Sequence, residues 1–262
     1  MKKMFSDRLN SINLNFLFSG RTTVGGEWRG FVDSPTYTRL YFVVSGEGKI
    51  ICDGRELKLL AGGWYLIPSG VSFEYSCTDS MDHIFFHLKL CSSSGPDLLS
   101  GLQVPMALSG GEELSQRIVS LNSPDLAELL SVKCDMLNTI LKNLSKLGIS
   151  LSEKRFSPAV EGGVRFINEN LRSTLTAEEI AVALFVSKST LAKHFRRELG
   201  MSVGEYINAA VLDEARRLLL GTRLSVKEIS DSLAFSDQFY FSKKFKCRYG
   251  LSPREYRKKP IA

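Results

Sequence analysis

The chain has 262 residues, of which 44% are hydrophobic and 24% are charged. This composition is typical of a globular protein of roughly two domains and excludes a disordered chain. No apolar run of about 18 residues occurs, and none follows the lysines of the opening MKKMFSDRLN, so the sequence indicates neither a membrane span nor a signal peptide. We therefore expect a cytoplasmic protein with no membrane contact.

The net charge of +6 is concentrated in the C-terminal part of the chain. Residues 158–262 contain 18 Lys and Arg against 12 Asp and Glu, whereas residues 1–157 contain 16 of each kind. A basic half joined to a neutral half favours an anionic partner for the basic half, and nucleic acid is the commonest. The five cysteines form no C-x-x-C pair, which favours reduced thiols over a disulfide framework or a zinc site.

Short strands are predicted for residues 10–95. Apolar runs and alternating apolar residues are separated by turn signals at Gly46-Glu47-Gly48, Asp53-Gly54 and Gly62-Gly63. Asp-Gly between apolar runs is a strong hairpin signal, because both residues can take a positive φ. Many short strands at this spacing indicate an antiparallel sandwich or barrel.

Three features of this part carry a family resemblance: the Gly46–Gly48 turn, the Gly-rich step before Trp64–Pro68, and a last strand at His83–Leu90. Together they resemble the small cupin barrel that binds ligands in AraC-type transcription regulators. A metal-dependent cupin enzyme is not favoured, because the histidines of this half, His83 and His87, would lie about 13 Å apart along a strand. We expect no metal and no other cofactor.

The last predicted strand places His83, Phe85 and His87 on one face. If this face looks into the barrel, it offers aromatic area with polar tips, which a pocket for a small molecule uses. Arg39 and Tyr41 share a face of an earlier strand, and an arginine suits a carboxylate or phosphate. The alternative is that these are ordinary barrel-filling and surface side chains. The candidate ligand-binding residues are Arg39, Tyr41, Tyr65, Tyr75, His83, Phe85 and His87.

Helices are predicted for about residues 112–148. Leucine and isoleucine recur at three- and four-residue steps from Leu126 to Leu147, the stripe of an amphipathic helix or helix pair. This stripe either packs on its own barrel or, as the resemblance to AraC-like proteins implies, forms a contact between two subunits. Residues 151–157 are predicted to be a linker.

The C-terminal part repeats one unit. Leu175–Tyr206 matches Leu224–Tyr256 at an offset of 49 residues in its first half and 50 in its second, so one residue is added after Ser236. Each copy opens with a capping box, Thr176 with Glu179 and Ser225 with Glu228, and another follows each unit. A short capped helix, a turn and a second helix with an apolar pair four residues apart is the helix-turn-helix arrangement.

The second helix of each copy presents small and basic residues opposite its apolar pair. Small residues let a helix backbone approach base edges, and lysine binds guanine or phosphate. Phe239 either contacts a thymine methyl group or turns into the core. The candidate DNA-binding residues are Lys188, Ser189, Ala192, Lys193 and Arg196 in the first copy and Gln238, Phe239, Ser242, Lys243 and Lys246 in the second.

The duplicated pattern, with SDQFYFSKKFK followed by GLSPREYR, resembles the double helix-turn-helix domain of AraC-type regulators over about residues 158–258. The predicted fold is α+β in two domains. Residues 1–150 form a cupin-like antiparallel β-barrel with following helices, and residues 158–262 form an all-α double helix-turn-helix domain.

The resemblance implies a sequence-specific regulator of transcription rather than an enzyme. It would bind double-stranded DNA in the major groove as a homodimer, respond to a small molecule such as a sugar or another metabolite, and act as an activator with RNA polymerase. One alternative is a regulator that senses nothing and whose barrel only dimerises; another is a cupin enzyme with a DNA-binding tail.

Overall fold

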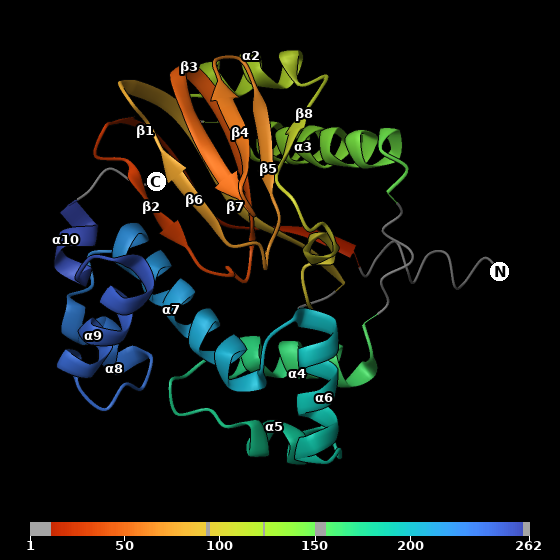
Figure 1. The fold of residues 1–262 in the computed structure, drawn as a ribbon, viewed down its shortest axis with the longest axis vertical. Helices are drawn as coiled ribbons and strands as arrows, with labels where there is room; N and C mark the ends of the chain where they lie inside the picture. Colours follow the sequence, from red (N-terminus) through yellow and green to blue (C-terminus); the bar gives the residue numbers. More distant parts are fainter. Residues whose placement is uncertain (1–11, 93–94, 123, 150–155, 259–262) are drawn as a thin grey trace.

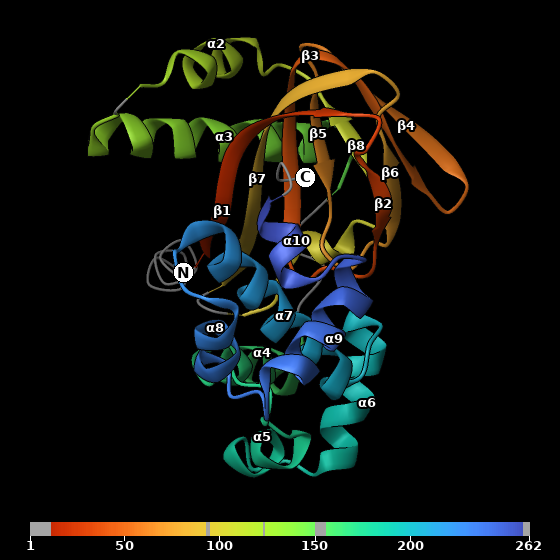
Figure 2. The same cartoon turned by 90° about the vertical axis from the view of Figure 1, so that its left-hand side faces the viewer.

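The computed structural model describes residues 12–92, 95–122, 124–149 and 156–258. A β-sheet and two helices form the N-terminal part, and seven described helices form the C-terminal part beneath it (Figure 1). The long helix α7 (Val203–Gly221) runs along the boundary between them (Figures 1 and 2). The predicted linker, residues 151–157, falls mostly outside the described residues, and Ser157 already caps the first C-terminal helix.

Eight strands of the described chain belong to one antiparallel sheet. Its central path runs β1-β7-β3-β5-β8, with β4 and β6 pairing to the other half of β3 and β2 pairing to β6. The strands are β1 (Ile12–Gly25), β2 (Arg29–Val32), β3 (Thr38–Cys52), β4 (Arg55–Leu60), β5 (Trp64–Ile67), β6 (Phe73–Ser76), β7 (Ser80–Ser92) and β8 (Met106–Leu108).

The predicted turn at Gly46–Gly48 is wrong, because β3 continues through it. Gly46 has a φ of 75°, the register against β7 shifts between Val43 and Ser45, and the strand bends. A Cβ at Gly46 would lie 2.0 Å from the carbonyl oxygen of Ser80, so only glycine fits this close approach. The bend divides β3 between two sets of partners.

The strand pairings of the described residues do not close the sheet into a ring. β1, β2, β4 and β8 each pair with a single neighbour, so the sheet is folded over but open at its edges. The antiparallel N-terminal sheet is therefore confirmed, whereas the closed barrel is not. The hairpin predicted at Asp53-Gly54 is confirmed, since both residues have positive φ between β3 and β4.

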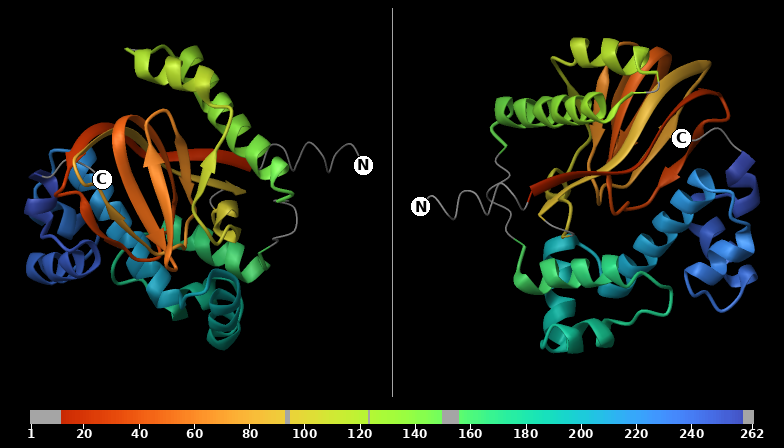
Figure 3. Two further views of the ribbon diagram at one scale, coloured as in Figure 1. Left: turned by 45° about the horizontal axis from the view of Figure 1, so that its top comes forward. Right: turned by 180° about the vertical axis from the view of Figure 1, so that it is seen from behind.

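Two helices cover one face of the sheet, α2 (Glu112–Ser120) and α3 (Leu126–Lys146). Met136, Ile140 and Leu144 of α3 pack against Leu40, Phe42, Leu88 and other apolar side chains on that face of the sheet. The start of α3 projects beyond the sheet together with α2 (Figure 3). There the leucines of the predicted stripe are exposed, with Leu126 at 72% and Leu130 at 51%. The stripe is thus divided between internal packing and open surface.

The C-terminal helices follow the predicted repeat. They are α4 (Pro158–Glu169), α5 (Ala177–Ala183), α6 (Lys188–Leu199), α7, α8 (Val226–Ser232), α9 (Gln238–Tyr249) and α10 (Pro253–Lys258), whereas the short 3-10 helix η1 (Leu98–Gly101) lies between β7 and β8 of the N-terminal part. The capping boxes at Thr176, Ser202 and Ser225 form with both hydrogen bonds, and Ser252 exchanges the same pair with Glu255. The four boxes are therefore confirmed.

One apolar core joins the two helix-turn-helix units. Leu191 and Phe195 of α6 and Phe241 and Phe245 of α9 are fully buried in it, as their spacing predicts. Helix α7 contributes its stripe of Ile207, Val211, Ala215 and Leu219 to the same core. No helix in the described ranges is both long and apolar enough to cross a membrane.

Candidate nucleic-acid interface and sensor site

Helices α6 and α9 are the second helices of the two helix-turn-helix units, and we call them the reading helices. They have the same length and end in the same way. Each has 12 residues and stops at a glycine with a φ of 75°, Gly200 or Gly250. Helix α6 is capped by Ser187, but α9 is capped by Asp237, whose carboxylate accepts the amides of Phe239 at 2.7 Å and Tyr240 at 2.8 Å. The residue added to the second copy is therefore Asp237, the N-cap of α9. Because it stands before the helix, α6 and α9 match residue for residue along their whole length.

The predicted contact residues lie on the outer faces of these helices. Lys193 is exposed on α6 and Lys243 on α9, and Phe239 is 85% exposed, so it does not belong to the core. Gln238 and Ser242 are half-buried, and the others are exposed. Two of the basic residues have acidic neighbours: Lys188 lies 3.7 Å from Glu178, and Arg196 lies 3.5 Å from Glu205. Exposed pairs of this kind are weak, so both charges can turn to phosphates.

Glu198 fixes the start of α4 to the end of α6. Its carboxylate accepts the amide of Ser157 at 2.7 Å and lies 2.8 Å from Nδ1 of His194. Burial alone would raise the pKa of Glu198, but the hydrogen bonds from Ser157, His194 and Arg197 outweigh burial and lower the pKa to about 2. This charged cluster therefore sets the geometry of the first unit.

The predicted ligand residues of β3 and β7 share the face of the sheet opposite to α3. His83 and Phe85 are fully buried, and their rings pack 6.0 Å apart. Burial lowers the pKa of His83 to about 4 and that of His87 far below its ordinary value, so both imidazoles are neutral. Tyr65 lies in the same core, but its hydroxyl accepts the amide of Leu60 and so serves the β4–β5 turn.

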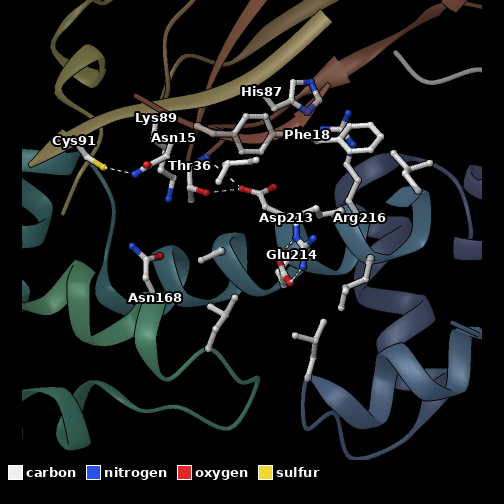
Figure 4. A pocket seen from close by; sticks show the side chains of 18 of the residues that line it. Asn15, Phe18, Thr36, His87, Lys89, Cys91, Asn168, Asp213, Glu214 and Arg216 are labelled. Carbon is white, nitrogen blue, oxygen red and sulfur yellow. Dashed lines mark hydrogen bonds and ion pairs between the residues drawn. The ribbon is translucent and has the colours of Figure 1, made fainter. Parts of the chain in front are cut away.

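Two cavities lie where this face meets the C-terminal helices. The larger measures about 550 Å³ and lies between β1, β7 and α7, with His87, Lys89 and Arg216 among its walls (Figure 4). The second measures about 310 Å³ and is lined by Trp28 and Tyr75 from the sheet and by residues of the α9–α10 turn. The described residues contain no group of three or more His, Cys, Asp and Glu side chains arranged to hold a metal ion.

A small space of about 20 Å³ adjoins the second cavity and is bounded by Arg39, Tyr41 and Tyr75. Trp28, Phe31, Tyr75, Tyr249 and Tyr256 line both spaces, so they are continuous walls of one region. The structure therefore brings together Arg39, Tyr41 and Tyr75 of the predicted set, with His87 on the wall of the larger cavity. Tyr65, His83 and Phe85 line none of these spaces, and the last two are fully buried in the core.

Polar side chains join the two parts of the chain across this region. Asp213 of α7 accepts hydrogen bonds from Thr36 at 2.6 Å and from the Tyr249 hydroxyl at 2.8 Å, and pairs with Arg248 at 3.2 Å. Arg216, one turn further along α7, donates to the Tyr37 hydroxyl. The sequence reasoning did not identify Thr36, Tyr37, Asp213 or Arg216. In the sequence, the last two belong to a run of four charged residues, Asp213, Glu214, Arg216 and Arg217, which lies between apolar stretches of α7.

The fold and its two outer helices define a DNA-binding protein with two helix-turn-helix units behind a separate sheet domain. A family model described as a helix-turn-helix domain matches residues 180–259. The Msm operon regulatory protein of Streptococcus mutans is 29% identical over 245 residues, 88% of each chain. The HTH-type transcriptional activator AarP of Providencia stuartii is 35% identical over 116 residues, which cover 43% of this chain and 86% of AarP.

The chain belongs to the AraC-type family of transcription regulators. ToxT of Vibrio cholerae shares the two-domain fold, with a TM-score of 0.69 at 13% identity over 94% of this chain and 98% of ToxT. Further ToxT structures contain an unsaturated fatty acid or (E)-4-(8-methylnaphthalen-1-yl)but-3-enoic acid. The prediction of a regulator rather than an enzyme agrees with these relatives, which are transcription regulators.

Proposed function

We propose that this regulator reads a specific DNA sequence with α6 and α9 and that a small molecule bound against its N-terminal sheet controls the reading. The observation that carries the proposal is the pair of capped helices, equal in length, with basic residues on their outer faces. A helix-turn-helix protein places such a helix in the major groove, where small and basic side chains reach base edges and phosphates. Because the two outer faces differ in sequence, we infer that the two halves of one subunit's site differ.

The effector site that we propose lies between the face of the sheet opposite to α3 and helices α7, α9 and α10. The cavities there have volumes in the usual range for small-molecule sites. The larger one has mixed apolar, polar and charged walls, whereas the second is lined by aromatic side chains together with Glu27, Arg29 and Arg248. The bound acids of ToxT support a sensor role for this fold. A ligand in this position would contact both parts of the chain, so it could favour one arrangement of the reading helices over another.

We further propose that the protein is a homodimer and an activator that contacts RNA polymerase. The exposed leucines at the start of α3 are the surface that supports dimerisation, since an apolar group of this kind is typically covered by a partner. The name of AarP supports activation. A regulator whose N-terminal part only dimerises is the second candidate, and the exposed α3 leucines are equally compatible with it.

Selection of genomic fragments by the purified full-length protein, followed by footprinting, tests the proposal. We expect a protected site long enough for two adjacent major-groove contacts per subunit, which span about 34 Å. Binding that is equal on all fragments would contradict sequence-specific reading. Thermal unfolding in the presence of a metabolite library separates the two candidates, because only a sensor is stabilised by a particular compound.

A further inference from the structure

Arg39 is a buried charge for which the described structure supplies no opposite charge. Its side chain is 3% exposed, and it lies on β3 with its guanidinium directed at aromatic rings, 5.1 Å from the centre of Tyr37 and 5.2 Å from that of Phe73. It donates one hydrogen bond, 3.2 Å long, to the Tyr37 hydroxyl, and its Nη1 has no hydrogen-bond partner. A buried charge with no opposite charge beside it is strongly unfavourable in a protein.

The carboxylate of Asp213 does not form an ion pair with the guanidinium of Arg39. It is engaged by Thr36, Arg248 and Tyr249. No ion pair among the described residues includes Arg39. A second buried guanidinium, that of Arg216, donates to the same Tyr37 hydroxyl, so two positively charged groups share one neutral oxygen. The local charge is therefore positive.

The space beside Arg39 is too small for a whole effector molecule. Its volume of about 20 Å³ is room for about one water. It shares aromatic walls with the cavity of about 310 Å³, where the indole Nε1 of the buried Trp28 also has no hydrogen-bond partner. A ligand body in the second cavity would lie between Trp28 and Tyr75 of the sheet domain and Tyr249 and Tyr256 of the second helix-turn-helix unit.

We propose that Arg39 binds an anionic oxygen group, a carboxylate or a phosphate, of an effector whose apolar or aromatic body fills this second cavity. The proposal rests on the sensor role proposed above and assigns the chemical class of the ligand. Arginine presents two parallel N–H groups that match the oxygens of either anion. Because the walls come from both the sheet and α9–α10, the same ligand bridges the sensor and the second reading unit.

The test compares the full-length wild-type chain with R39M and with R55M, whose arginine is exposed in the β3–β4 hairpin. Thermal unfolding is measured in chloride alone, then with acetate, inorganic phosphate, phenyl phosphate or 4-phenylbutanoate at constant ionic strength. The neutral 4-phenylbutanamide is the matched control for 4-phenylbutanoate. In chloride, R39M should unfold at the wild-type temperature or above it, because the uncompensated charge is gone.

We expect at least one anion to stabilise the wild type and R55M saturably, and the affinity of R39M for it to fall about 10- to 100-fold. The carboxylate and phosphate series show which oxygen group is preferred. Unfolding of R39M well below the wild type in chloride would overturn the proposal, since Arg39 would then be a structural residue. Equal stabilisation of all three chains, or of none, would overturn it too.

Gel-shift titration of the same three chains on the selected DNA site keeps this proposal separate from the proposed function. Basal DNA affinity should be equal in the three chains, because Arg39 is buried on β3 and does not belong to the outer faces of α6 and α9. Anion binding that depends on Arg39 in a chain without specific DNA binding would refute the regulator and leave the anion site standing. Specific DNA binding together with no Arg39-dependent anion binding would refute the anion site and leave the proposed regulator standing.

Discussion

The hydroxyl of Thr36 donates a 2.6 Å hydrogen bond to the carboxylate of Asp213 and so ties the segment before β3 to the middle of α7. The same carboxylate pairs with Arg248 and accepts the Tyr249 hydroxyl, both at the end of the second reading helix. One side chain thus connects the sheet domain, the long helix and the second helix-turn-helix unit. In Figure 4, Asp213 points toward Thr36 from α7 below the sheet.

Asp213→Asn should weaken this connection. Burial alone would raise the pKa of Asp213, but Arg248 and the hydrogen bonds from Thr36 and Tyr249 outweigh burial, so its pKa lies below the ordinary value and the group is charged at neutral pH. The substitution leaves Arg248 without its charge partner, and we expect a loss of roughly 1 to 3 kcal/mol in the free energy of unfolding. Chemical denaturation at pH 7 measures it, with the exposed Asp231→Asn as control.

Small-angle scattering adds a readout that is specific to the connection. If Asp213 holds the two parts together, Asp213→Asn should increase the radius of gyration while Asp231→Asn leaves it unchanged. An unaltered radius in both variants would show that the domains are held by other contacts.

Lys193→Ala and Lys243→Ala should each weaken specific DNA binding by roughly 1 to 3 kcal/mol without unfolding the protein. Both lysines are exposed on the outer faces of the reading helices, so their removal leaves no cavity. Fluorescence anisotropy on the selected site measures the effect, and Lys58→Ala on β4 is a control at the other end of the molecule. Wild-type affinity in both variants would count against these faces as the DNA interface.

Glu198→Gln should make the free energy of unfolding less dependent on pH in the acid range. The pKa of Glu198 is lowered from 4.5 to about 2, so its contribution to stability is complete above about pH 4.5 and is lost as the pH falls toward 2. At pH 7 the variant should lose roughly 1 to 3 kcal/mol, because the amides and cations around the carboxylate lose a charged acceptor. Urea denaturation from pH 7 to pH 2.5 should show the two stability curves converging at the acid end; parallel curves would contradict the assignment.

The double substitution Leu126→Glu and Leu130→Glu should convert the proposed dimer into a monomer. Both leucines are exposed on one side of α3, one turn apart, so acidic side chains there cost little in the monomer but repel across a shared interface. Sedimentation velocity measures the mass, and the control is Leu60→Glu, at a leucine on β4 that is 47% exposed. A wild-type protein that sediments as a monomer at all concentrations would refute the dimer itself.

Gly46→Ala should destabilise the protein far more than Gly54→Ala. Both glycines have a positive φ, which costs another residue roughly 1 to 2 kcal/mol. A Cβ at Gly54 meets no atom within 4 Å, whereas at Gly46 it would overlap the Ser80 carbonyl. We expect a loss above roughly 4 kcal/mol for Gly46→Ala, measured by thermal unfolding. Similar losses at the two positions would mean that β3 can bend elsewhere.

The local features of the C-terminal part could be read from the sequence because each depends on neighbours in the chain. A capping box needs two residues three apart, and the buried pairs Leu191–Phe195 and Phe241–Phe245 need only the helical repeat. The turn at Gly46 was misjudged because the same residue serves a hairpin turn and a strand bend. Only the approach of Ser80, distant in sequence, distinguishes them.

The sequence by itself determined the double helix-turn-helix, the antiparallel strands and, apart from Phe239, the residues on the outer faces of α6 and α9, since the 3.6-residue and two-residue periods fix which side chains share a face. Only the tertiary structure decided that the sheet stays open, that the leucine stripe of α3 is half covered, and that Asp213 meets Thr36 and Tyr249. These contacts join segments separated by long stretches of chain, and no local pattern records which of many possible partners a buried polar group will find.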